Sequence, residues 1–207
     1  MAAVWLAALA APAAAQQLTY HQLPEGAQPA YIVTGPDGAL WFTEQGPGRI
    51  GRLSVEGALR EFGLIRPGSK PRMLAAGNGA IYYTDPLAGQ LGRLDLDGRV
   101  KETSVQYCPR SSCGVRLPDD LTVAPDGLVW FSVDTLFATG AAPEDSYQDV
   151  CSVRPGLDGD QCTRIDPVFV PTGHATSGPT VGPDGAMWFT NKWLDIVGRI
   201  PASGTRS

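Results

Sequence analysis

One motif, Gly-Pro-Asp-Gly-x-hydrophobic-Trp-Phe-Thr, recurs along this chain and constrains its fold more than any other feature. It occupies residues 35–43 and 182–190, and close variants occupy 77–84 and 124–132. The leading aromatic residues of the four copies lie 41, 48 and 58 residues apart, at Trp41, Tyr82, Trp130 and Trp188. A unit of this length, in which short strands alternate with tight turns, is typical of a β-propeller blade.

Each repeat can be divided into four short strands. In the first repeat we expect them at residues 30–34, 40–43, 49–53 and 58–62. Pro36 presets φ for the turn between the first two, and Gly38 accepts the positive φ that closes it. The Ile-Gly-Arg of the third strand returns as Leu91-Gly92-Arg93 and Val197-Gly198-Arg199. No window has a sustained helical period, so the sequence predicts an all-β fold.

The repeats define a propeller over residues 16–207, with blades at approximately 29–63, 71–105, 118–171 and 177–207. The last repeat stops after its third strand, whereas residues 17–24 look like an outer strand without a blade. Pairing the two segments would close a four-blade ring and remove its exposed edges. The alternative is that the four repeats are a fragment of a larger propeller.

The ends and the charge of the chain limit its location and partners. Residues 1–15 are uncharged and apolar and end in Ala13-Ala14-Ala15, which predicts a signal peptide and a secreted or periplasmic protein. No other segment is long and apolar enough for a membrane span. The net charge is −5, and the 16 Lys and Arg form no run. This pattern argues against nucleic-acid binding.

Four cysteines in an exported chain are most simply two disulfides. They lie where the repeat spacing is stretched, at Cys108, Cys113, Cys151 and Cys162. We therefore predict the local pairs Cys108–Cys113 and Cys151–Cys162. A four-cysteine zinc site is the rival interpretation, but the chain has no Cys-x-x-Cys spacing.

Residues 28–62 resemble a known family. They contain Trp41-Phe42-Thr43-Glu44 and Arg49-Ile50-Gly51-Arg52, in the order and spacing typical of the streptogramin lyases of the virginiamycin B lyase type. The likeness extends more loosely over all four repeats. The resemblance implies a seven-bladed propeller that opens a cyclic depsipeptide antibiotic by elimination, using Mg²⁺ and a histidine base. Seven blades of about 42 residues need roughly 290 residues, so on this reading the chain is part of a seven-blade ring.

In that family the working histidines follow the proline of the inner strand. The equivalent positions here are Ala30, Arg72, Asp119 and Ser177, and none is a histidine. The chain has two histidines, and only His174 lies near an inner strand. His174 and Asp119 are therefore the candidate catalytic bases.

Inner strands of a propeller converge on its axis, where we expect a ligand in the central funnel. The polar candidates to line it are Tyr31, Arg72, Asp119, Asp120 and Ser177. The adjacent carboxylates Asp119 and Asp120 could bind a divalent cation with help from Asp85 or Asn191. The alternative is that one of these carboxylates caps a turn.

Three hypotheses about function stay open at this point. The first is an enzyme, either a streptogramin lyase with Mg²⁺ or a related metal-dependent propeller hydrolase such as a lactonase. The second is a secreted, non-catalytic binding or scaffold propeller for a small-molecule or peptide-like ligand. The third is a truncated gene product without activity. Fold alone cannot separate them, because one architecture serves many functions.

Overall fold

The computed structural model of the chain describes residues 18–105, 115–136, 147–157, 168–169, 176–191 and 195–201. Within these ranges the regular secondary structure consists of β-strands, which confirms the all-β prediction. The predicted signal peptide over residues 1–15 lies outside them. Within the described residues, no helix is long and apolar enough to cross a membrane.

The strands form four antiparallel sheets in chain order, which are the four blades. Blade 1 contains β1 (Pro29–Thr34), β2 (Leu40–Glu44), β3 (Arg49–Leu53) and β4 (Leu59–Gly63). Blade 2 contains β5 (Leu74–Gly77), β6 (Ala80–Asp85), β7 (Gln90–Asp95) and β8 (Val100–Ser104). Blade 3 contains β9 (Val115–Val123), β10 (Val129–Leu136), β11 (Tyr147–Val153) and β12 (Val168–Phe169). Blade 4 contains β13 (Thr176–Val181), β14 (Met187–Asn191) and β15 (Ile196–Ile200).

The recurring Asp of the turn motif fixes the corner of the blade. Gly35 and Gly38 close the first turn, with Gly38 at a φ of 75°. The carboxylate of Asp37 accepts a hydrogen bond from Trp41 Nε1 at 2.9 Å and one from Arg52 Nε at 2.6 Å. Burial raises the pKa of Asp37, but the hydrogen bonds from Trp41, Arg52 and the Ala39 amide outweigh it and hold the pKa below its usual value. The aspartate therefore anchors the turn and the tryptophan that follows it.

The two aromatic residues of each motif pack in opposite directions. Because side chains alternate along a strand, Trp41 faces blade 2, whereas Tyr83 of blade 2 faces back toward it. The same pattern places Tyr82 against blade 3 and Trp130 against blade 4. The cores of the molecule are thus the spaces between consecutive blades.

This packing explains why a glycine recurs in the third strand of the repeat. Gly51, Gly92 and Gly198 lie directly beneath the rings of Phe42, Tyr83 and Phe189. A β-carbon at any of the three would overlap the ring above it. The glycine of the third strand is therefore required by the second aromatic residue of the motif.

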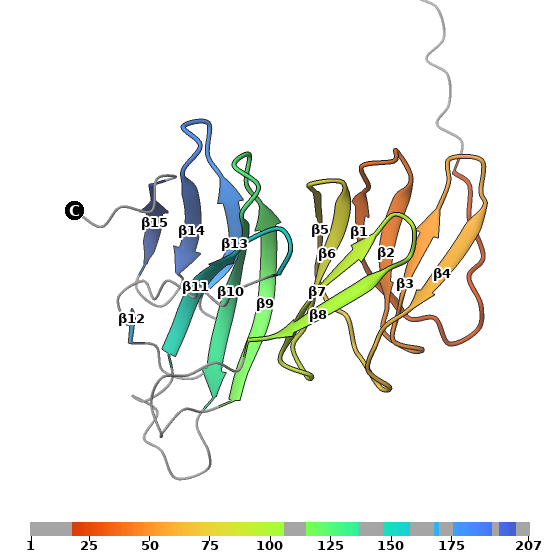
Figure 1. The fold of residues 1–207 in the computed structure, drawn as a ribbon, viewed down its shortest axis with the longest axis horizontal. Helices are drawn as coiled ribbons and strands as arrows, with labels where there is room; N and C mark the ends of the chain where they lie inside the picture. The colour runs from red at the N-terminus through yellow and green to blue at the C-terminus, as the bar shows by residue number, and fades with distance from the viewer. Residues whose placement is uncertain are drawn as a thin grey trace, which may run out of the picture.

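The blades form an open arc, with blade 1 and blade 4 at its two ends (Figure 1). The sequence predicted that residues 17–24 form the outer strand of blade 4, but residues 18–24 do not form a strand. His21 instead lies close to Gly57, in the turn between β3 and β4 of blade 1. Within the described residues, β15 is the last strand of its sheet. The prediction that this segment closes a four-blade ring is therefore wrong, and the four blades form an arc.

Candidate functional site: the bulges of the inner strands

Three of the four inner strands have a register shift in their pairing with the second strand, and in blade 2 the backbone of Thr84 bonds both Arg72 and Met73. In blade 1 the register shifts between Pro29 and Ile32, and in blade 3 the partners of Phe131 and Val133 show the shift. In blade 4 it lies between Ser177 and Thr180. A β-bulge bends its strand and redirects a side chain, and bulges are common beside active sites. The inner-strand positions predicted to line the funnel lie at or next to these bulges.

The last residue of the Trp-Phe-Thr motif holds the bulge in place. Thr43 Oγ1 accepts a hydrogen bond from the Tyr31 amide at 3.0 Å, and Thr84 Oγ1 accepts one from the Met73 amide at 3.3 Å. In blade 3, Ser132 Oγ accepts one from the Asp120 amide at 3.1 Å. Sequence reasoning missed this role, although the signal was visible, since every copy of the motif has a hydroxyl residue at this position.

Polar contacts connect the bulge of each blade to the next. Thr43 Oγ1 donates to the Arg72 carbonyl oxygen at 3.2 Å, which connects blades 1 and 2. Arg72 Nη1 lies 2.8 Å from Asp119 Oδ1, which connects blades 2 and 3. The Gly178 amide donates to Asp120 Oδ2 at 2.7 Å, which connects blades 3 and 4. We call this set of residues the bulge row.

Arg72, in the bulge row, and Tyr31, at the bulge of blade 1, present long side chains to solvent. The Asp119 side chain is 7% exposed, whereas the Arg72 side chain that neutralises it is 42% exposed. Tyr31, at the bulge of blade 1, is 39% exposed. A guanidinium has five N–H donors, so Arg72 can bind Asp119 and still donate to a carbonyl or carboxylate of a ligand. The buried Asp119 carboxylate thus holds the Arg72 guanidinium in place, and the guanidinium is accessible to a ligand.

Connecting loops pack together next to Arg72. The loop into β5 is fixed by the Lys70 amide, which donates to Asp85 Oδ2 at 3.0 Å, and by Lys70 Nζ, which donates to the Gln45 carbonyl oxygen. Two exposed apolar side chains belong to these loops. Ile65 precedes Lys70 and is 58% exposed, and Leu87 lies between β6 and β7 and is 80% exposed. The two loops, which are joined by the bond between Lys70 and Asp85, therefore carry exposed apolar side chains.

The predicted metal ligands are not brought together. Asp85 uses its two oxygens for the amides of Lys70 and Ala88, and Asp119 and Asp120 bind Arg72 and Gly178. Asn191 is buried on β14. Within the described residues, no three His, Cys, Asp or Glu side chains are placed to hold a metal ion. The residues described here therefore do not fit the Mg²⁺ site that the resemblance implied, and Asp120 and Asp85 instead hold the backbone.

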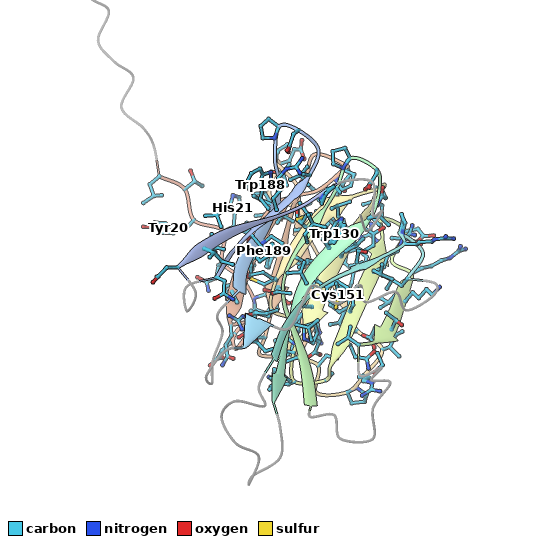
Figure 2. The ribbon with its side chains drawn as sticks, turned by 90° about the vertical axis from the view of Figure 1, so that its left-hand side faces the viewer. Tyr20, His21, Trp130, Cys151, Trp188 and Phe189 are labelled. Atoms are coloured by element: carbon cyan, nitrogen blue, oxygen red, sulfur yellow. The ribbon has the colours of Figure 1, made fainter. Side chains whose placement is uncertain are left out.

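The remaining predicted residues are placed only in part. Ser177 lies on β13 opposite Thr190, which puts its backbone in the bulge row. His174 lies outside the described residues, as do Cys108, Cys113 and Cys162. Cys151 is fully buried on β11 (Figure 2) and is not a free thiol. The pairs Cys108–Cys113 and Cys151–Cys162 stay predictions.

One buried carboxyl lies apart from the bulge row. Glu44 at the end of β2 is fully buried, and no hydrogen-bond donor among the described residues reaches either of its oxygens. Burial, together with the neighbouring Glu61 carboxyl, raises the pKa of Glu44 to about 7, although Arg49 opposes the rise. Asp85 occupies the matching position of blade 2 and accepts hydrogen bonds from two backbone amides. Glu44 differs from Asp85 because its oxygens accept none from the described residues.

The family can now be identified from the comparison with known families. Residues 2–147 match the model of the virginiamycin B lyase family. This chain belongs to that family. Among curated proteins, none matches it significantly.

Solved structures show the same fold at low identity. The catalytically inactive virginiamycin B lyase from Staphylococcus aureus with quinupristin is 23% identical, with a TM-score of 0.57, and the match covers 88% of this chain and 59% of that one. A streptogramin B lyase is 22% identical, with a TM-score of 0.60, over 90% of this chain and 56% of that one. A gluconolactonase from Xanthomonas campestris is 19% identical, with a TM-score of 0.54, over 79% and 53%. This member of the virginiamycin B lyase family thus spans less than two thirds of the length of these structures.

Proposed function

We propose that this chain is a non-catalytic binding propeller, which holds a small-molecule or peptide-like ligand at the bulge row. The observation that carries the proposal is the pair of Arg72 and Asp119. It places a half-exposed guanidinium at an inner-strand position where the family resemblance implied an imidazole. An arginine supported by a buried carboxylate is a fixed cation, and it is suited to binding rather than to proton abstraction.

The bulge row and its loops support an amphipathic, carbonyl-rich ligand. Arg72 offers charged N–H donors, and Tyr31 on the neighbouring blade offers an aromatic face and a hydroxyl. Ile65 and Leu87 add exposed apolar surface on the loops before β5 and after β6. A few placed polar groups beside apolar surface are typical of small-molecule sites. The lyase from Staphylococcus aureus, a relative in fold, has a structure with quinupristin.

The same geometry argues against streptogramin linearisation. Removing a proton next to a carbonyl needs a base of suitable pKa within hydrogen-bond reach. A guanidinium is a donor and cannot accept a proton from a ligand, and the Asp119 carboxylate is paired with Arg72. Asp120 is held by the Gly178 amide. Loss of a proper general base typically lowers the rate by about 10²–10⁴-fold.

Calorimetric titration of the purified protein with quinupristin, the ligand of the fold relative, tests the proposal. We expect binding by the wild type and at least a tenfold weaker Kd for Arg72→Ala. Arg99→Ala is the matched control, because its side chain is 84% exposed in the turn before β8 and its ion pair, among the described residues, is with the exposed Asp97. Mass spectrometry of the same samples should show intact ligand. Turnover on the order of 1 s⁻¹, or equal binding by Arg72→Ala, would overturn the proposal.

Export is part of the same proposal. It is supported by the uncharged apolar residues 1–15 and by the cysteine usage of the chain. We expect the exported protein to begin at Gln16 and to contain the pairs Cys108–Cys113 and Cys151–Cys162. N-terminal sequencing of exported protein and non-reducing peptide mapping check both points. A retained leader or four free thiols would contradict them.

A further inference from the structure

Arg72 is held by groups from three consecutive blades. Its amide donates to the Thr84 carbonyl oxygen of its own blade at 2.8 Å. Its carbonyl oxygen accepts a hydrogen bond from Thr43 Oγ1 of blade 1 at 3.2 Å. Its guanidinium Nη1 lies 2.8 Å from Asp119 Oδ1 of blade 3. The backbone and the charged end of this residue are therefore fixed by separate contacts.

The Thr43 hydroxyl joins Arg72 to a second residue of the proposed site. Oγ1 accepts a hydrogen bond from the Tyr31 amide at 3.0 Å while it donates to the Arg72 carbonyl oxygen. Tyr31 lies within the register shift of β1, so it has no register partner on β2. The inner strands β1 and β5 lie side by side (Figure 1). One hydroxyl thus connects two residues that are 41 positions apart in the sequence.

The chemistry of Thr43 suits it to hold this geometry. A hydroxyl has one hydrogen to donate and lone pairs that accept, so the bond to Arg72 leaves an acceptor for the Tyr31 amide. The β-branched side chain has few χ1 rotamers. Thr43 is fully buried at the junction of blades 1 and 2. Water therefore does not compete for either hydrogen bond.

The equivalent hydroxyls of blades 2 and 3 make only the first kind of bond. Thr84 Oγ1 accepts a hydrogen bond from the Met73 amide, and Ser132 Oγ accepts one from the Asp120 amide. Among the described residues, neither of these two hydroxyls donates to the backbone of a neighbouring blade. Of these three hydroxyls, that of Thr43 is the one that bridges two blades.

We propose that Thr43 is a positioning residue of the ligand site, whose hydroxyl holds Tyr31 and Arg72 at the separation at which both contact one ligand. The proposal rests on the proposed function, in which Arg72 binds the ligand. Thr43 itself is fully buried and touches no ligand. It acts through the backbones of the two residues that do. Groups that bind together must be held within about 0.5 Å of their productive geometry, so loss of the hydroxyl weakens binding.

The variants Thr43→Val and Thr43→Ser separate the hydroxyl from the shape of the side chain. Valine keeps the branched shape without the hydroxyl, whereas serine keeps the hydroxyl. In ¹⁵N-labelled protein without ligand, the Tyr31 amide should be protected from hydrogen exchange in the wild type. Exchange should be about tenfold faster in Thr43→Val, as expected for the loss of one buried hydrogen bond, and serine should restore the protection.

Calorimetric titration with quinupristin measures the consequence for binding. We expect a Kd about tenfold weaker for Thr43→Val and a return toward the wild-type Kd for Thr43→Ser. Gly92→Ala is the control for stability, because its added β-carbon meets the Tyr83 ring and no group of the bulge row. It should lower the melting temperature and leave the Kd unchanged.

A double variant shows whether Thr43 acts through Arg72. If it does, adding Thr43→Val to Arg72→Ala should weaken binding much less than it does in the wild type, because contacting groups are not additive. An equal loss in both backgrounds, or a wild-type Kd for Thr43→Val, overturns the proposal.

The exchange measurement needs no ligand and no variant to be decisive. A Tyr31 amide that exchanges freely in the wild type overturns the proposal, even if Thr43→Val does not fold. A wild type that does not bind quinupristin contradicts the proposed function instead. Exchange at Tyr31 then still decides whether the Thr43 hydroxyl holds this residue.

Discussion

Arg72 of blade 2 reaches across to blade 3 and places its Nη1 2.8 Å from Oδ1 of the buried Asp119. These residues are 47 positions apart in the sequence, and the contact joins the segment that leads into β5 to the inner strand β9. It is both a clasp between blades and the support of the group that we propose binds ligand. Stability and binding should therefore change together when it is altered.

The first prediction concerns the two members of this pair. Arg72→Ala removes the cation that faces the buried Asp119 carboxylate, which should destabilise the fold by about 1–3 kcal/mol, less than for a fully buried pair because Arg72 is half-exposed. Asp119→Asn removes the buried charge and should cost less. Urea unfolding of both single variants and the double variant measures their coupling.

A coupling energy of about 0.5–3 kcal/mol is expected for groups in direct contact. The double variant should accordingly be more stable than the sum of the single changes indicates. Simple additivity of the two changes would show that the pair does not act as one unit.

The second prediction concerns the hydroxyls that fix the bulges. Thr84→Val keeps the side-chain shape but removes the acceptor of the Met73 amide, so a loss of about 1–3 kcal/mol is expected. Thr103→Val on the outer strand β8 is the control, and a change within about 0.5 kcal/mol is expected there. Thermal unfolding of both variants checks this. Equal melting temperatures would contradict a role for the hydroxyl in holding the bulge.

Much of the fold could be predicted from the repeat alone. The turn residues Gly35 to Gly38 and the spacing of the aromatic residues specify each blade locally, and the strands begin and end within a few residues of the predicted positions. The sequence left open whether the four blades close into a ring or are part of a larger propeller. Whether residues 18–24 pair with β15 depends on the relative positions of blades 1 and 4, about which no local pattern carries information.

The site could be predicted less well than the fold. Position in the repeat placed Arg72 and Asp119 on the inner strands, but not their pairing across blades, which depends on side-chain reach. The adjacent Asp119 and Asp120 suggested a metal site, whereas the bulge sends one carboxylate to Arg72 and the other to the Gly178 amide. Asp119 and Asp120 are adjacent in the sequence, but one contacts blade 2 and the other contacts blade 4.

The third prediction concerns the glycine beneath the second aromatic residue. Gly92→Ala would place a β-carbon against the Tyr83 ring, whose hydroxyl is held at 2.7 Å by Glu102 Oε1. The ring cannot move without breaking that bond, so we expect a loss of about 1–3 kcal/mol from overpacking. Gly63→Ala on β4 is the control, because its β-carbon meets no atom within 4 Å. Chemical denaturation should separate the two variants clearly, and equal midpoints would contradict this account of the Gly-Arg repeat.

The last prediction concerns the pH dependence that Glu44 introduces. Its folded-state pKa of about 7 lies above its ordinary value of 4.5, because of burial and the Glu61 carboxyl. Between these values the folded state keeps a proton that the unfolded chain has released. The stability that comes from this proton is fully present below pH 4.5 and is lost as the pH rises through 7.

Glu44→Gln holds the position neutral at every pH and should remove this loss. Relative to the wild type, the variant should gain on the order of 2–3 kcal/mol between pH 4 and pH 8, measured as the difference in the free energy of unfolding at each pH. Glu56→Gln, in an exposed turn of the same blade, is the control and should leave the wild-type decline in place. If Glu44→Gln and the wild type lose stability in parallel as the pH rises, the carboxyl is ionised in the folded protein at neutral pH. Its burial without a donor would then require a partner that the described residues do not supply.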